Sequence, residues 1–137
     1  MMNTISHHAA LIYVMAVVSA SDGNMSGPEL RAMGNLVKTL PVFRDFDEHR
    51  LLTVSQECAS ILTEQDGLDA VLGLIKDALP DHLCDTAYWL ALEIALTDAQ
   101  VRLEEVRVIE LLRRALNVER LVAAALERAA RARFQTA

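Results

Sequence analysis

Two stretches of the chain are apolar around nearly the whole circumference of a helix, and they constrain the fold more than any other feature. One is LIYVMAVV, residues 11–18, and the other is AYWLALEIAL, residues 87–96, in which Glu93 is the only charged residue. A helix that is apolar on every side must be surrounded by other elements. The sequence therefore predicts two central helices, over residues 4–21 and 82–97.

Amphipathic patterns and turn signals predict five further helices, over residues 26–41, 45–63, 67–79, 103–116 and 118–133. Ser26 and Glu29 have the spacing of a capping box, with Pro28 near the start of the helix. Asp45 with Glu48 has the same spacing, and Asp66 and Asp81 are expected to cap the helices that follow them. No strand pattern appears, so we expect an all-α fold of about seven helices in a single bundle-like domain over residues 1–137.

The composition supports one helical domain and argues against a nucleic-acid partner. The chain has 137 residues, of which 53% are apolar but only 4% aromatic, so its core must consist mainly of aliphatic side chains. The formal net charge of −6 disfavours binding to phosphates. Three arginines near the end of the chain, Arg128, Arg131 and Arg133, are spaced as a solvated helix surface.

The start of the chain and the two cysteines predict a reduced, cytoplasmic protein without a membrane span. MMNTISHHAALIYVMAVVSAS lacks the basic segment of a signal peptide, and its apolar stretch is shorter than the roughly 18 residues that a span requires. Cys58 and Cys84 lie within apolar helical patterns, and two cysteines alone do not make a zinc site. We expect both to be reduced thiols in the core.

The segment SASDGNMSGPE, residues 19–29, resembles the start of a calcium-binding EF-hand loop, but the pattern fails at its last ligand. Counting from Asp22, loop position 12 falls on Met33, where an EF-hand requires a bidentate glutamate. A thioether does not replace a carboxylate as a ligand for calcium. Another constraint must explain the order Asp-Gly-x-apolar-Ser-x-x-Glu.

An internal repeat supplies such a constraint. AVVSASDGNMSGPELRAMGNLV, residues 16–37, aligns with LEIALTDAQVRLEEVRVIELLR, residues 92–113. The alignment pairs Asp22 with Asp98 and Glu29 with Glu105, so each copy has an aspartate and a glutamate seven residues apart. We therefore expect two helical hairpins, each with an acidic turn, packed about an approximate twofold axis.

With these duplicated turns, the chain resembles the tellurite-resistance TerB-like family, whose members carry two helical hairpins with an Asp-Gly-x-apolar-Ser-x-x-Glu turn. The likeness extends over nearly the whole chain, including EQDGLDAVLGLIKDALPDHLCDTAYWLALEIALTDAQV in the middle. The first copy matches the family turn at Asp22, Gly23, Ser26 and Glu29. The second matches at Asp98, Val101 and Glu105, but has Ala99 in place of the glycine and Arg102 in place of the serine.

The resemblance implies a cytoplasmic domain linked to tellurite resistance and the response to chemical stress, with a proposed metal-binding role for the acids of the turns. The family is not known for an enzymatic reaction. The candidate metal ligands are Asp22, Glu29, Asp98 and Glu105. The departures at Ala99 and Arg102 put a symmetric second site in doubt.

Two interpretations of these acids stay open. Glu29 and Ser26 can form a capping box, and Asp22 can accept hydrogen bonds from amides of the turn, which would make the motif a structural joint. Alternatively, Asp22 and Asp98 follow the carboxyl ends of apolar helices, where the helix dipole disfavours a negative charge. A divalent cation would compensate it, and carboxylate oxygens suit Ca²⁺, Mg²⁺ or Mn²⁺ better than Zn²⁺.

The remaining polar residues suggest no catalytic site. His7 and His8 are adjacent, so they point about 100° apart on a helix, and His49 and His82 are isolated. Glu93 is either a buried general base or, as is more usual, an acid that faces solvent. We expect no enzyme. A protein-interaction module, a chaperone-linked role and a carboxylate-based hydrolase stay open as alternatives, and the partner would be another protein or a second copy of the chain.

Overall fold

The computed structural model describes residues 4–21, 26–97 and 103–137, and within these ranges it contains seven α-helices and no strand. The expectation of an all-α fold is confirmed. The helices are α1 (His7–Ala20), α2 (Gly27–Thr39), α3 (Leu51–Leu62), α4 (Gly67–Ala78), α5 (Cys84–Ala95), α6 (Leu103–Ala115) and α7 (Arg120–Arg133). Three short 3-10 helices, η1 (Pro41–Phe43), η2 (Glu48–Arg50) and η3 (Asp81–Leu83), lie in the connections. None of the helices in these ranges is long and apolar enough to cross a bilayer.

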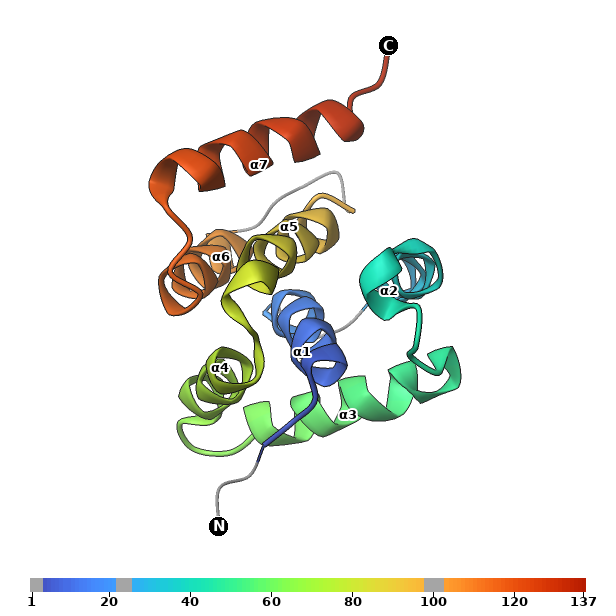
Figure 1. The fold of residues 1–137 in the computed structure, drawn as a ribbon, viewed down its shortest axis with the longest axis vertical. Helices are drawn as coiled ribbons and strands as arrows, with labels where there is room; N and C mark the ends of the chain where they lie inside the picture. The colour runs from blue at the N-terminus through green and yellow to red at the C-terminus, as the bar shows by residue number, and fades with distance from the viewer. Residues whose placement is uncertain (1–3, 22–25, 98–102) are drawn as a thin grey trace.

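Helix α1 lies at the centre of the molecule, and the other helices are arranged around it (Figure 1). It packs against α3 and α4 on one side and against α5 on the other, with further contacts to α2 and α6. Helix α2 packs on α5, and α6 contacts both α1 and α5. Helix α7 is the outermost element and packs on α5.

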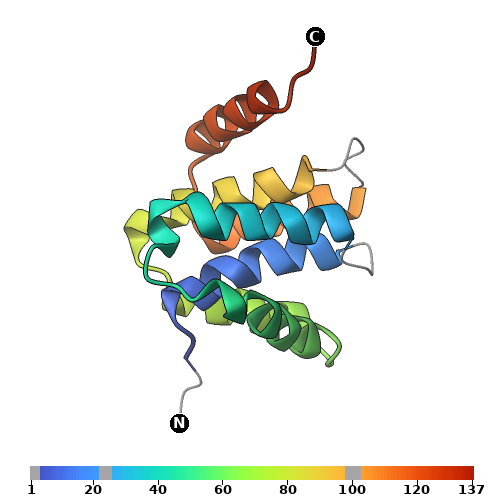
Figure 2. The same cartoon turned by 90° about the vertical axis from the view of Figure 1, so that its right-hand side faces the viewer.

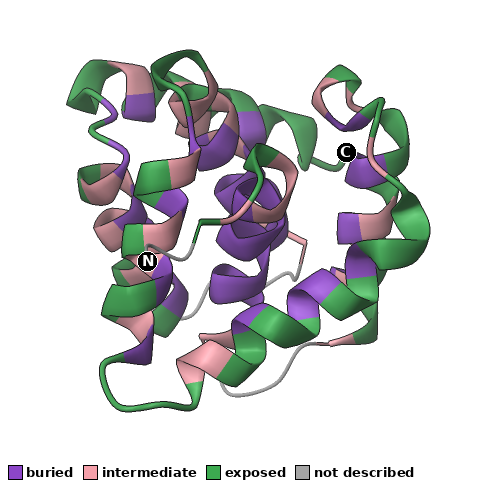
Figure 3. Ribbon diagram, turned by 60° about the horizontal axis from the view of Figure 1, so that its bottom comes forward, coloured by how far each residue is buried: buried purple, intermediate pink, exposed green. Residues whose placement is uncertain are grey.

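The core follows the two apolar stretches of the sequence. Every residue from 10 to 19 is buried along α1, and so is every residue from 90 to 95 along α5. In Figure 3 the buried segments gather along the central helix, while the surrounding helices are exposed on their outer sides. The expectation of two central helices is therefore confirmed, and burial of aliphatic side chains is the main force that holds the bundle together.

The capping box at the start of α2 is also confirmed. The Glu29 backbone N–H donates to Ser26 Oγ at 3.2 Å, and the Ser26 backbone N–H donates to Glu29 Oε1 at 3.2 Å. Met33, which would be the last ligand of an EF-hand loop, is fully buried on the inner side of α2. It is therefore a core residue.

Several expected helix starts are wrong. Helix α1 begins at His7 because Ser6 caps it, accepting from the Ala9 N–H. The helix expected from residue 45 is interrupted: Asp47, rather than Asp45, caps η2, and α3 begins only at Leu51. Asp66 and Asp81 make no capping hydrogen bond through their side chains. The segment between α2 and α3 instead forms two 3-10 turns that carry the buried ring of Phe43 to the core.

The corner between α3 and α4 requires a glycine. Asp66 has a φ of 58°, in the left-handed region, and Gly67 directly follows it. A Cβ atom at Gly67 would lie 2.2 Å from the carbonyl oxygen of Ile61 in α3. Because that oxygen belongs to helical backbone and cannot move freely, the two helices approach each other here at a distance that only glycine permits.

Candidate functional site

The ends of four helices gather on one side of the molecule. The carboxyl ends of α1 and α5 and the amino ends of α2 and α6 lie together at the right-hand side of Figure 2. Of the four predicted ligands, Glu29 and Glu105 are in the helices that begin there. Asp22 and Asp98 lie outside the described residues, so their positions stay predictions, as does the repeat of the two turns.

Glu29 and Glu105 occupy equivalent places. Each is the third residue of its helix, and each is 3% exposed. Burying a carboxylate is unfavourable unless it gains hydrogen bonds or a compensating charge. The amino end of a helix partly provides both, because its free N–H groups and its dipole attract negative charge. Sequence analysis selected both residues, but it did not predict that they would be buried.

In the described residues this geometry of Glu29 serves to cap α2. The bond from the Ser26 N–H uses Oε1 of Glu29, so the other carboxylate oxygen is not part of it. Within the described ranges no group of three or more His, Cys, Asp or Glu side chains is arranged to hold a metal ion. Since two of the four predicted ligands fall outside those ranges, a site made by all four is neither supported nor contradicted.

Ser19 is a polar residue of this end that sequence analysis missed. It belongs to the last turn of α1 and is fully buried, and its hydroxyl has no hydrogen-bond partner among the residues that the structure describes. The sequence pattern alone does not predict whether a serine among apolar residues is buried or exposed. An unpaired buried hydroxyl is unfavourable, so Ser19 adds polarity to a place that already holds two buried carboxylates.

Glu93 is buried, which makes the expectation that it faces solvent wrong. It is 2% exposed, and its Oε1 accepts from Nε of Arg133 in α7 at 2.5 Å. In this ion pair the Glu93 carboxylate compensates the charge of the Arg133 guanidinium. Arg133, which was expected only to carry a solvated surface charge, therefore has a structural role.

A second polar pair joins the same two helices. The Tyr88 hydroxyl of α5 donates to Oε1 of Glu127 in α7 at 2.9 Å. Burial raises the pKa of Tyr88, and the hydrogen bond to the Glu127 carboxylate raises it further. The hydroxyl therefore stays protonated and remains a donor.

The cysteines are not activated nucleophiles. Cys58 is fully buried, its Sγ lies 3.9 Å from the Tyr13 carbonyl oxygen, and burial raises its pKa to about 12. Cys84 is only partly buried, so its expected place in the core is wrong, but burial also raises its pKa, and Asp81 and Asp85 nearby add to the effect. A thiol with a raised pKa holds little thiolate at neutral pH.

The histidines have structural or exposed positions. His7, His49 and His82 are exposed. Nε2 of His8 lies 2.9 Å from the Val42 carbonyl oxygen, and its ring stacks on Phe43 with 6.0 Å between centroids. The rings of His7 and His8 lie only 4.1 Å apart despite their adjacent positions. His8 thus fastens the start of α1 to the segment that follows α2.

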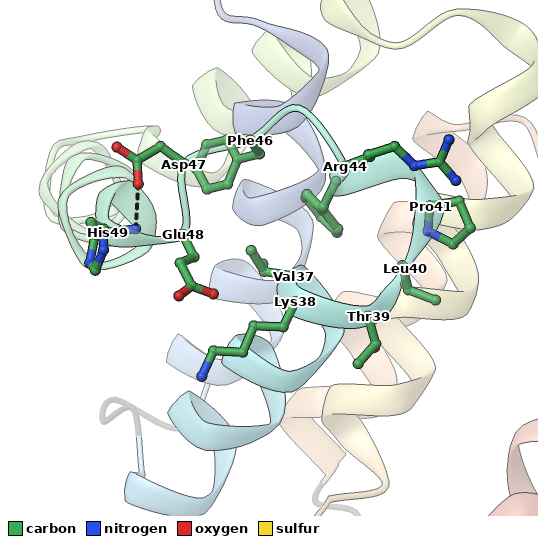
Figure 4. A pocket seen from close by; sticks show the side chains of 11 residues that line it. Val37, Lys38, Thr39, Leu40, Pro41, Arg44, Phe46, Asp47, Glu48 and His49 are labelled. Carbon is green, nitrogen blue, oxygen red and sulfur yellow. Dashed lines mark hydrogen bonds between the residues drawn. The ribbon is translucent and has the colours of Figure 1, made fainter.

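A pocket lies elsewhere, at the carboxyl end of α2. It has a volume of about 480 Å³ and is bounded by residues 37–41 and by several side chains of residues 43–49. In Figure 4, Lys38 and Glu48 extend toward the same side of the pocket while the guanidinium of Arg44 points away. The pocket thus presents no single charge, and Lys38 is nine residues along α2 from Glu29, roughly 14 Å at 1.5 Å per residue.

Comparison of the chain with protein-family models, with curated proteins and with solved structures gives no significant match. The resemblance to the TerB-like family therefore depends on the residues of the two turns and of the segment between them.

Proposed function

We propose that the chain is a non-enzymatic TerB-like domain, linked to tellurite resistance and the chemical-stress response, that binds a divalent cation through Asp22, Glu29, Asp98 and Glu105. The observation that carries the proposal is the equivalent burial of Glu29 and Glu105 in helices that begin at the same end of the molecule. Carboxylate oxygens at one end of the molecule are suitable ligands for a hard cation.

The chemistry of the four side chains fits a hard cation. Ca²⁺, Mg²⁺ and Mn²⁺ prefer carboxylate oxygens, and such a cation would supply the positive charge that offsets the acids. Asp22 and Asp98 follow the carboxyl ends of α1 and α5 in the sequence, where the helix dipole disfavours a negative charge. Glu29 would share its carboxylate between the cation and the cap of α2.

The direct test is thermal unfolding of the full chain with added CaCl₂, MgCl₂ or MnCl₂, together with calorimetric titration. A ligand that binds only the folded protein stabilises it by RT ln(1 + [L]/Kd), so the melting temperature should rise with concentration. Asp22→Asn should remove most of this rise while costing little stability without metal, because asparagine still accepts hydrogen bonds in the turn. Asp98→Asn should matter less, since its turn lacks the glycine and the serine.

Ser26→Ala is the matched control. It removes the cap of α2 and should cost about 1 kcal/mol whether or not metal is present. If none of the three ions releases heat or raises the melting temperature at millimolar concentrations, metal binding is rejected, and Glu29 caps its helix and nothing more.

A protein-interaction module is the second candidate, and an exposed apolar pair favours it. Leu103 and Val106 are one turn apart on α6 and are 71% and 52% exposed. Isolated exposed apolar residues are common, but a pair on one helix face is a suitable contact for a partner. The chaperone-linked role belongs to this second candidate. If it is correct, replacing Leu103 and Val106 by serine would weaken the binding of a partner protein and leave the melting temperature unchanged.

A further inference from the structure

Helix α7 is attached to the rest of the molecule in a different way from the other helices. It lies outside the bundle in both orientations and packs on α5 (Figures 1 and 2). Of its 14 residues only Ala123 and Ala130 are buried. Because these side chains are small, and because Val122 and Leu126 pack against the core only partly buried, α7 buries less apolar surface than α1, and its detachment should cost less.

Two polar pairs add to the attachment. Tyr88 and Glu93 of α5 bind Glu127 and Arg133 of α7 at 2.9 and 2.5 Å. Cavities of about 240 Å³ flank the contact on both sides, one beside Leu92 and Leu96, the other beside Leu36 and Phe134. The two pairs therefore favour one position of α7 along α5, and the apolar contacts beside them, which include Val122 and Leu126, are only partly buried.

Detachment alone would leave α5 in an unfavourable state. Glu93 would lose its ion-pair partner Arg133, and Leu92 and Ala95, which are 5% and 2% exposed with α7 near them, border a cavity that α7 helps to enclose. Apolar side chains and an unpaired carboxylate on one surface favour its being covered again. The helix that covers it must offer small side chains and an arginine at the matching spacing.

The connection between α6 and α7 is a short turn that contains a residue with a positive φ. Asn117 has a φ of 54°, and the N–H of Val118 donates to the Arg113 carbonyl at 3.0 Å while that of Asn117 donates to the Arg114 carbonyl at 3.1 Å. These bonds form a Schellman motif, which ends α6. Asparagine adopts this left-handed conformation more readily than most residues, although less readily than glycine. If Asn117 and Glu119, which has an extended ψ of 146°, both adopted helical angles, α6 and α7 would join into one helix over residues 103–133.

We propose that α7 exchanges between two copies of the chain, so that Arg133 of one copy pairs with Glu93 of the other and Glu127 with Tyr88. These observations favour a second copy of the chain as the partner of α5. Its α7 is identical in sequence, so it carries the same side chains and charges that α5 already binds. Exchange of an identical element requires no new contact surface and changes only the hinge. The exchange is independent of metal binding and goes beyond the proposed function.

The hinge provides the first test. Asn117→Gly favours the left-handed turn and should keep the chain monomeric, whereas Asn117→Ala favours a continuous helix and should promote the dimer. Measured by analytical ultracentrifugation after refolding at several concentrations, the dimer dissociation constant should be lower for Asn117→Ala than for Asn117→Gly by about tenfold or more. Equal distributions of mass for the two variants would overturn the proposal.

A pair of reversed charges tests the exchange directly. Glu93→Arg and Arg133→Glu each place like charges together when α7 lies on its own chain. When the two variants are mixed and refolded, each α7 finds an opposite charge on the other chain, so a one-to-one heterodimer should form although neither variant dimerises alone. Circular dichroism of each variant checks that it folds, and the Asn117 variants decide the matter if one does not.

The results of the mixing experiment show whether the α7 that packs on α5 can come from a second copy of the chain. A heterodimer of the reversed variants supports exchange. If hydrogen exchange shows that α7 opens in both variants and the mixture nevertheless stays monomeric, exchange does not occur and the proposal is wrong. If α7 stays protected in both variants, it is a fixed part of the fold and the proposal is equally wrong.

Discussion

Helices α1 and α7 each contain 14 residues, yet they are held by different interactions. Helix α1 is buried over residues 10–19 and contacts helices on all sides, whereas α7 buries only two alanines, and partly buried aliphatic side chains and two polar pairs with α5 complete its attachment. The difference shows that helix length says little about stability. What counts is whether a helix removes large apolar side chains from water or only aligns charges along a neighbour.

The two modes of attachment imply two scales of opening. Loss of α1 would expose the core, so its backbone amides should exchange only when the whole protein unfolds. Helix α7 can separate while the remaining helices keep most of their contacts, so its amides should exchange through local opening. Substitutions in the two helices should therefore differ in size and also in the part of the molecule that they affect.

The largest loss of stability is expected from a leucine-to-alanine change in α1, and the same change in α7 is its control. Leu11 in α1 is fully buried and Leu121 in α7 is 82% exposed. Leu11→Ala leaves a cavity and should lower the free energy of unfolding by about 2–5 kcal/mol. Leu121→Ala, its matched control, should change it by less than about 0.5 kcal/mol. Urea denaturation measures both, and similar losses would mean that α7 is buried against something else.

An intermediate effect is expected at the ion pair. Arg133→Ala leaves Glu93 buried without its charged partner and should destabilise the docking of α7 by about 1–3 kcal/mol. Glu93→Gln should cost less, because a neutral amide tolerates burial better than an unpaired carboxylate. Hydrogen exchange should show faster exchange in α7 and unchanged exchange in α1. Faster exchange in α1 would mean that the two helices open together.

The smallest effect should depend on pH. Hydrogen bonds from Arg113 hold the pKa of Glu110 at about 2, below its ordinary 4.5. Partial desolvation raises this pKa, whereas the positive charges of Arg113 and Arg114 lower it further. A carboxylate whose pKa is lowered by folding contributes stability above its unfolded pKa and loses it as the pH falls through the folded value.

Because the Glu110 side chain is 47% exposed, its contribution should be only about 0.3–0.5 kcal/mol. Glu110→Gln should cost this amount near neutral pH and only a small part of it at about pH 2, where the wild-type carboxyl is about half protonated. Denaturation curves of both proteins over this range would measure the difference. A difference that persists at the acid end would come from packing and not from charge.

The features that sequence analysis predicted correctly are those fixed by neighbours along the chain. The all-round apolar character of residues 11–18 requires burial wherever the helix lies, and the Ser26–Glu29 capping box closes within one turn. The interrupted start of α3 was missed because Asp45 and Asp47 both fit a cap, and the choice depends on how Phe43 reaches the core.

Glu93 was misplaced for a related reason. One charge in an apolar stretch is compatible with solvent or with a buried partner, and that partner, Arg133, comes 40 residues later in a helix that reads as a solvated surface. The candidate metal site is likewise a long-range feature, since Glu29 and Glu105 come from different helices. The sequence pointed to both acids through the repeat, but their burial follows from the packing of α1, α2, α5 and α6.

The close approach at Gly67 restricts which residues homologous proteins can carry at this position. Any side chain at this position would collide with the Ile61 carbonyl oxygen, so mutations there are removed by selection unless the α3–α4 connection changes length at the same time. A homologue with the same corner should therefore carry glycine at the aligned position, preceded by a residue that tolerates a positive φ. This criterion lies far in the chain from both acidic turns, so it can separate common ancestry from a chance likeness of those turns.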